Sequence, residues 1–237
     1  MTRRRWIADE VSGNRAALTG DHAHHLIRVL RARTGQEFDI VANGVLYNAA
    51  VDTISEDRVE FELKAEIPAS TPAPVTILLS IFKFDRMEWA IEKCTELGVS
   101  KIIPVIARRT DAHLASASAK RVDRWRRIAM QASEQSRRAS QPEISQPARL
   151  QDALEIPGAF RIVLAESETH STLRGLVASN SSKEVALAIG PEGGWTSEEL
   201  DAFNKEGWAL ASLGPTILRA ETAAIVATAV AILELSE

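Results

Sequence analysis

The chain has 237 residues, of which 45% are hydrophobic and 25% charged, and this balance excludes a protein that is disordered overall. Cys94 is the single cysteine, so a disulfide within the chain and a thiolate metal cluster are excluded, and a reducing compartment is expected. No apolar run follows the basic residues 1–6, and the run 223–233 is too short to span a bilayer. We therefore expect a cytoplasmic protein without a signal peptide.

The net charge of −4 conceals two basic segments. Residues 1–33 hold seven arginines against three acidic residues, and residues 118–149 hold eight lysines or arginines against three. Two such segments are typical of a protein that binds an anionic polymer. Charge alone favours the other interpretation, in which both are solvated faces of ordinary elements.

Residues 1–68 are typical of a small β-rich domain. The expected strands are 36–41, 45–54 and 58–65. Asn43-Gly44 is a strong hairpin signal between the first two. A helix is expected from Asp21, which can cap it, to Leu30. Pro68–Pro74 contains three prolines, which resist both helix and central strand, so we place a domain boundary there.

From Val75 onward, strands alternate with helices, which predicts a mostly parallel sheet in an α/β fold. Five strands are expected, at 75–82, 101–107, 161–165, 185–189 and 209–213. Helices are expected at 85–97, at 120–138, after Thr196 and at 220–235. Thr196 and Glu199 have the spacing of a capping box.

The last expected helix has almost no polar side between Ala223 and Leu233. A helix that is apolar all round must be covered on every side. One face of a single sheet cannot do this, so a homodimer interface through this helix is the simple solution.

Several common catalytic motifs are absent. The chain has no G-x-G-x-x-G after a strand, no phosphate-binding G-x-x-x-x-G-K-[ST] and no G-x-S-x-G. His22, His24 and His25 lack the spacing of a zinc site, and no metal is expected. Packing and surface hydrogen bonding is the ordinary role for these histidines, and contact with RNA is the functional alternative.

Two Gly-Pro loops remain, each between a short apolar run and a helical pattern. They are Ile189–Trp195, with the sequence IGPEGGW, and Leu213–Thr222, with the sequence LGPTILRAET. Glycines bring bare backbone close to a ligand, and a helix N-terminus offers free N–H groups. One such loop is as well explained by a tight turn. The pair, with Arg219 and Glu221 at the start of an apolar helix, indicates a ligand site, although an ion pair that caps the helix is the structural alternative.

These two loops together resemble the RsmE family of 16S rRNA (uracil(1498)-N(3))-methyltransferases, in the SPOUT superfamily. Other segments agree with the same family: 83–99 resembles its first helix motif, 124–136 its basic helix, and 23–31 its N-terminal motif. The resemblance covers nearly the whole chain. Two positions depart from the family pattern. Thr216 stands where Arg is usual, which implies one lost contact to RNA or cofactor, and Arg137 stands where Gly is usual, which implies a different end to the basic helix.

The resemblance implies a PUA-like RNA-binding β-barrel domain at 1–70. It implies a SPOUT methyltransferase domain at 73–237, a parallel sheet with a C-terminal trefoil knot. The implied cofactor is S-adenosylmethionine, and the implied partners are 16S rRNA of the small ribosomal subunit and a second copy of the chain.

The implied site residues fall into three groups. Arg219 and Glu221 would be catalytic. The cofactor would contact Leu164, Ala165, Glu166, Ile189, Gly190, Pro191, Glu192, Gly193, Gly194, Leu213, Gly214, Ile217, Leu218, Arg219 and Thr222. RNA would contact Arg3, Arg4, Arg5, His25, Arg28, Arg31, Arg124, Arg127 and Arg138.

Methylation of uracil N3 requires loss of the N3 proton or stabilisation of the resulting anion. Arg219 is expected to stabilise the anion or hold the target phosphate, and Glu221 or Glu192 to act as the base. Two other functions stay open: a SPOUT ribose 2′-O-methyltransferase acting on tRNA or rRNA, and an RNA-binding protein without catalysis.

Overall fold

The computed structural model describes residues 5–68 and 73–236 of a chain that divides into two units. Unit 1 comprises Met1–Thr71 with Ser133–Gln141, and unit 2 comprises Pro72–Ala132 with Pro142–Glu237. Residues 69–72 of the expected boundary segment lie outside the described residues. The domain limits 1–70 and 73–237 stay a prediction, and the membership of 133–141 in unit 1 was not foreseen.

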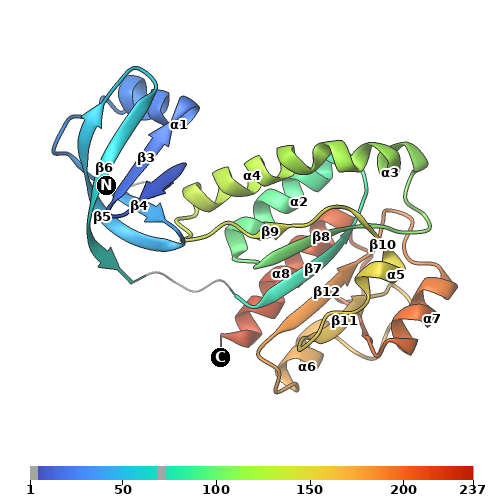
Figure 1. Ribbon diagram of the computed structural model, residues 1–237. Helices are drawn as coiled ribbons and strands as arrows, with labels where there is room; N and C mark the ends of the chain where they lie inside the picture. Colours follow the sequence, from blue (N-terminus) through green and yellow to red (C-terminus); the bar gives the residue numbers. More distant parts are fainter. Residues whose placement is uncertain (1–4, 69–72, 237) are drawn as a thin grey trace. The chain divides into compact units, whose positions relative to one another are not determined.

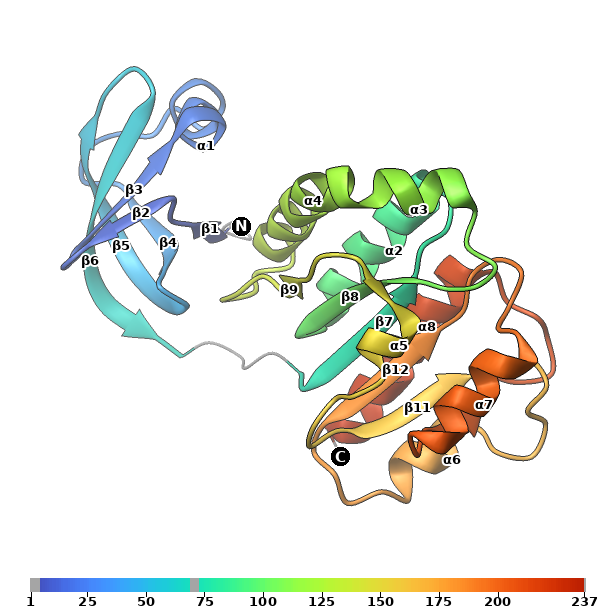
Figure 2. The same ribbon diagram turned by 45° about the vertical axis from the view of Figure 1, so that its right-hand side comes forward.

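Unit 1 is built on a six-stranded sheet with the order β1-β4-β5-β6-β3-β2, whose strands are labelled in Figure 2. Its strands are β1 (Arg5–Ile7), β2 (Glu10–Ser12), β3 (Arg15–Thr19), β4 (Glu37–Ala42), β5 (Val45–Ile54) and β6 (Arg58–Ile67). All pairs are antiparallel except β1 with β4. Buried side chains such as Trp6, Leu18 and Phe61 form its core.

The helix expected at 21–30 is present in an altered form. It consists of α1 (Gly20–His24) and a π-helical turn, η1 (His25–Val29). The wider turn lets the Leu30 amide donate to the His25 carbonyl, 3.1 Å away. Leu26 is buried, whereas the apolar side chains of Val29 and Leu30 are 64% and 44% exposed. Single π turns are frequent at functional sites.

Unit 2 contains a seven-stranded parallel sheet with the order β10-β8-β7-β12-β11-β13 and β9 paired to β8. Its strands are β7 (Val75–Ser80), β8 (Lys101–Ile106), β9 (Glu143–Ile144), β10 (Ala148–Arg149), β11 (Phe160–Leu164), β12 (Val185–Ile189) and β13 (Ala209–Ala211). The five expected strands are confirmed, and β9 and β10 are additional strands of two residues each.

Helices cover both faces of this sheet (Figures 1 and 2). They are α2 (Phe84–Leu97), α3 (Ala112–Ser118), the 3-10 turn η2 (Ala119–Arg121), α4 (Val122–Gln135), α5 (Leu150–Ala153), α6 (Leu173–Ala178), α7 (Ser197–Lys205) and α8 (Ala220–Leu235). One core joins Ile77 and Leu79 of β7 to α2, α6 and α8, and a second joins Leu78 to α5 and α7. Every residue of β12 is buried because both faces are covered.

The basic helix is shorter than the expected 120–138. It begins at Val122, after the turn η2, and ends at Gln135. Arg137 has a φ of +61°, in the left-handed region that favours glycine, and a residue with this backbone cannot continue an α-helix. The trefoil knot implied by the resemblance stays a prediction.

Candidate functional site

A cavity of about 910 Å³ lies in unit 2, at the carboxyl ends of neighbouring strands. Its walls come mainly from the loops 164–167 after β11, 190–197 after β12 and 211–219 after β13. These strands are parallel and adjacent, so their carboxyl ends meet at one edge of the sheet. Ligands bind at this edge in open α/β sheets.

The loop after β12 is held from several sides. Arg109 Nη1 donates to the Gly193 carbonyl at 2.6 Å, and Trp195 Nε1 donates to the Leu164 carbonyl at 3.1 Å. A Cβ on Gly190 would lie 3.2 Å from Trp195 Nε1, so a side chain there would displace the indole. Gly194 has a φ of +70° and closes a turn by donating to the Pro191 carbonyl. The loop therefore presents backbone to the cavity in one defined shape.

The helix after this loop begins as expected. Thr196 and Glu199 form the capping box: the Thr196 Oγ1 accepts from the Glu199 amide, and Glu199 Oε2 accepts from the Thr196 amide at 2.9 Å. The buried Glu199 also accepts from the Arg108 amide at 2.7 Å. One carboxylate thus ties the cavity loop to the segment after β8.

The wall after β13 is more open. Residues 214–217 are exposed, with Ile217 at 77%, and within the described chain no hydrogen bond involves the backbone of 213–218. Arg219 caps α8 with extended backbone and is exposed on the cavity wall. Among described residues it forms no ion pair, so its guanidinium is available to a ligand.

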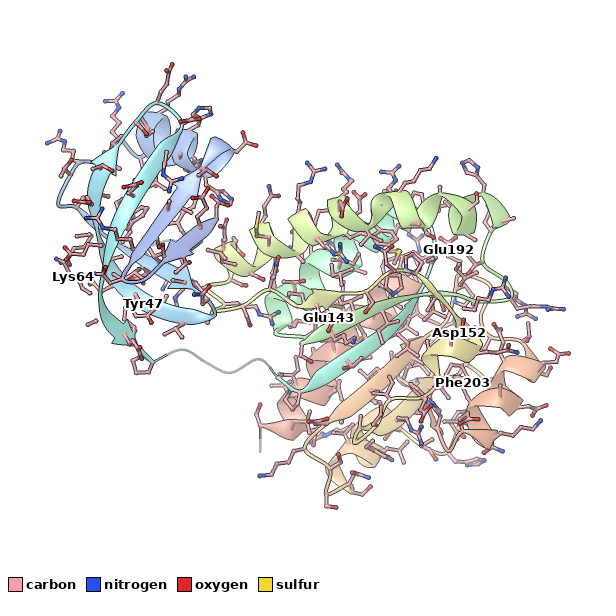
Figure 3. All side chains as sticks on the ribbon, viewed as in Figure 1. Tyr47, Lys64, Glu143, Asp152, Glu192 and Phe203 are labelled. Atoms are coloured by element: carbon pink, nitrogen blue, oxygen red, sulfur yellow. The ribbon has the colours of Figure 1, made fainter. Side chains whose placement is uncertain are left out.

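The Glu221 carboxylate is not on the cavity wall. Glu221 is 5% exposed, and its nearest cation is Arg86 of α2, with 3.7 Å between Glu221 Oε1 and Arg86 Nε. Arg86 Nη1 also donates to Glu192 Oε1 at 2.6 Å. Glu192, labelled in Figure 3, is exposed and does line the cavity. The structural alternative of an Arg219–Glu221 pair does not hold, because Glu221 pairs with Arg86.

Most of the residues expected to bind the cofactor meet at this cavity. Residues 164–166, 189–194, 213, 214 and 217–219 all line it, and Thr222 does not. Sequence reasoning missed Arg86 and Arg109, which lie 106 and 84 residues upstream of the loop residues they contact. No local signal marked them, since their partners are distant in the chain.

The residues expected to bind RNA in unit 1 differ in exposure. Arg3 and Arg4 lie outside the described residues. Arg28 and Arg31 are exposed, on either side of the exposed Val29 and Leu30. His25 is half-buried beside the Trp6 ring. Arg5 donates to the Arg137 carbonyl. Arg138 is 8% exposed, and burial lowers the pKa of its guanidinium to about 10. Contact between Arg138 and RNA stays a prediction.

On α4 the two expected RNA contacts also differ. Arg124 binds both oxygens of Glu88, at 2.7 and 2.8 Å, and these hydrogen bonds raise the pKa of Arg124. Arg127 is exposed and forms no ion pair with a described residue. Arg127 is therefore the freer of the two cations.

Two absences hold within the part of the chain that the structure describes. None of its helices has both the length and the apolar character needed to cross a membrane. None of its groups of histidine, cysteine, aspartate or glutamate side chains could hold a metal ion.

Comparison with known families explains this architecture. The RNA methyltransferase domain family matches residues 69–232, and the RNA methyltransferase PUA domain family matches residues 18–64. A relative from Synechocystis sp., ribosomal RNA small subunit methyltransferase E, is 33% identical over 90% of this chain and 71% of its own length. The ribosomal RNA small subunit methyltransferase E from Mycobacterium bovis is 33% identical over 91% of this chain and 85% of its own length. The chain belongs to the RsmE family.

Solved structures agree with this membership. RsmE from Neisseria gonorrhoeae, bound to S-adenosylmethionine, has a TM-score of 0.83 and 28% identity, over 96% of each chain. A methyltransferase from Legionella pneumophila with the same cofactor has a TM-score of 0.85 and 28% identity, over 98% of this chain and 97% of its own. The fold is thus a SPOUT-type parallel sheet preceded by a PUA-like domain, as the resemblance implied.

Proposed function

We propose that this RsmE-family chain transfers a methyl group from S-adenosylmethionine to N3 of uracil 1498 in 16S rRNA of the small ribosomal subunit. The proposal rests on the cavity formed mainly by the two Gly-Pro loops. Of the 15 residues expected to bind the cofactor, 14 line this cavity. Family membership supplies the reaction type. An rRNA substrate also accords with a cytoplasmic protein.

The cavity fits this cofactor. Its volume of about 910 Å³ lies within the usual range for small-molecule sites. The backbone of 190–194 offers amide and carbonyl groups for an adenine edge, while Leu164, Ile189 and Leu218 supply apolar surface. Exposed Glu166 offers a carboxylate that can accept hydrogen bonds from ribose hydroxyls.

When bound, S-adenosylmethionine supplies an electrophilic methyl group. The role of the protein is to make N3 of uracil nucleophilic, since N3 carries a proton near neutral pH. We propose that Arg219 stabilises the negative charge that spreads onto O2 and O4 as this proton leaves, because its guanidinium is exposed on the wall and free of ion pairs with described residues. Of the two expected bases, Glu192 lines this cavity and Glu221 does not, so Glu192 is the better placed.

Nucleoside mass spectrometry of 16S rRNA from a strain lacking this protein tests the function. We expect N3-methyluridine to disappear and to return when the purified chain is supplied with S-adenosylmethionine. Loss of a ribose 2′-O-methyl group with N3-methyluridine intact would identify the ribose methyltransferase instead. Absence of cofactor binding in calorimetry would favour an RNA-binding protein without catalysis.

We further propose that the chain is a homodimer through α8. Val226, Ala229 and Leu233 follow one another at helical spacing on the side of α8 away from its buried residues, and Leu233 is 66% exposed. Replacing Val226 with Asp would bury an unpaired charge in that interface. Sedimentation should show monomers of V226D where the natural protein sediments as a dimer, and a dimeric variant would refute the interface.

A further inference from the structure

Arg86 joins three segments that are far apart in the sequence. Its guanidinium lies between two carboxylates, with Nη1 at 2.6 Å from Glu192 Oε1 and Nε at 3.7 Å from Glu221 Oε1. Arg86 belongs to α2, Glu192 to the cavity loop after β12, and Glu221 to the first turn of α8. A planar guanidinium with several fixed donors is suited to bridging two carboxylates in this way.

The two carboxylates are in opposite environments. The Glu221 side chain is 6% exposed, and its Oε2 is buried without a hydrogen-bond partner among the described residues. A buried carboxylate is costly unless a charge compensates it, and Arg86 is its one cationic partner within 4 Å in the described chain. Glu192 is 39% exposed and belongs to the cavity wall. Glu221 therefore fixes Arg86 from the interior, and Arg86 contacts Glu192 at the surface.

An isolated ion pair at the surface contributes little, because its side chains lose rotamer freedom when they meet. Arg86 differs because its guanidinium is already restrained by the buried Glu221 carboxylate. Much of the side-chain entropy of Arg86 is therefore lost when the protein folds and not when a ligand binds. Such preorganisation favours binding.

We propose that Arg86 is a positioning residue: anchored by Glu221, it holds Glu192, and through it the 190–195 loop, in the shape that receives S-adenosylmethionine. The inference deepens the proposed function and rests on it for the identity of the ligand. It also gives Glu221 a role as the anchor of Arg86, which accounts for a carboxylate at the start of α8 that does not reach the cavity.

The test compares Arg86→Gln, Glu192→Gln and the double variant as full-length proteins. Calorimetry with S-adenosylmethionine should show Kd raised about tenfold in each single variant. The double variant should bind no more weakly than the weaker single one, because both substitutions remove the same contact. Hydrogen exchange of the 190–195 amides, measured without cofactor, should be faster in all three variants than in the natural protein.

Lys93 provides a matched control on the same helix. It is 32% exposed, against 31% for Arg86, and also bridges two carboxylates, Glu92 and Glu96, each at 2.8 Å. Lys93→Gln should change neither Kd nor exchange in 190–195. Arg86→Lys keeps the positive charge but loses the planar guanidinium with its fixed donors. Its Kd for S-adenosylmethionine and its exchange rate in 190–195 should lie between those of the natural protein and R86Q.

Exchange and Kd equal to those of the natural protein in R86Q and E192Q would overturn the proposal. The proposal would also be overturned if the fold-change in Kd of the double variant equalled the product of the fold-changes of the two single variants. Glu192→Gln changes an exposed side chain, so the test stands even if R86Q folds poorly. If the natural protein itself does not bind S-adenosylmethionine, the proposed function fails, and the exchange measurement still decides whether Arg86 holds the loop.

Discussion

The two Gly-Pro loops form two walls of one cavity, and they are built differently. The loop after β12 is fixed by Arg109, by the Trp195 indole, by the capping box of α7 and by Arg86 through Glu192. The loop after β13 exposes residues 214–217, and no hydrogen bond within the described chain involves its backbone at 213–218. A wall that is complete before a ligand arrives favours affinity, whereas an open wall can adapt to a larger partner. We therefore propose that the first wall fixes the cofactor in place, whereas the second, which also lines the cofactor cavity, is the side that is open to the RNA.

The strongest test of this division is Arg219→Ala, at the end of the open wall. Removing a group that stabilises the transition-state charge should lower kcat by about 100- to 1,000-fold. Kd for S-adenosylmethionine should stay within about twofold of the natural value, since the fixed wall is intact. Single-turnover kinetics and calorimetry check the two quantities, and full turnover in R219A would exclude the catalytic role.

Gly190→Ala tests the fixed wall. The new Cβ would crowd the Trp195 ring at 3.2 Å and disturb its hydrogen bond to Leu164. We expect Kd for S-adenosylmethionine to rise about tenfold, equivalent to about 1.4 kcal/mol. Gly175→Ala is the control, since its Cβ would lie 3.1 Å from Oγ1 of Thr172, the N-cap of α6, and neither residue lines the cavity. If G175A weakens binding as much as G190A, the effect is general destabilisation.

Ile217→Ser should have the smallest effect. Ile217 is 77% exposed, so the substitution removes no packing from the folded protein. We expect thermal stability and cofactor Kd to be unchanged, and KM for the RNA substrate to rise about two- to threefold, as for the loss of one modest apolar contact. A larger change in cofactor affinity than in KM for RNA would reverse the assignment of the two walls.

The main strands of unit 2 could be predicted because they are short apolar runs between helical patterns. The strands β9 and β10 could not, since two residues carry no periodicity. The π turn at His25–Val29 was missed for a related reason, because one extra residue in a helical turn has no compositional signature.

In the site, the backbone loops were easier to predict than the charged residues. Glycine and proline mark loops locally, so the walls of the cavity were found from the sequence. Arg219 and Glu221 are close in sequence, which suggested one shared site. Arg219, however, is the N-cap with extended backbone, whereas Glu221 lies in the first turn of α8, so their side chains point in different directions. Glu221 consequently faces α2, where its partner Arg86 is 135 positions away in the chain.

The position of β12 has a consequence for folding during synthesis. This strand pairs with β7 on one side and β11 on the other, although it follows both in the sequence. Until residue 189 has left the ribosome, β7 has an unpaired hydrogen-bonding edge, and β11 has no neighbour that joins it to the earlier strands. Parallel pairing across such separations is slow, and open strand edges favour aggregation. A nascent chain that stalls before β12 should therefore depend on chaperones far more than one that stalls after α8.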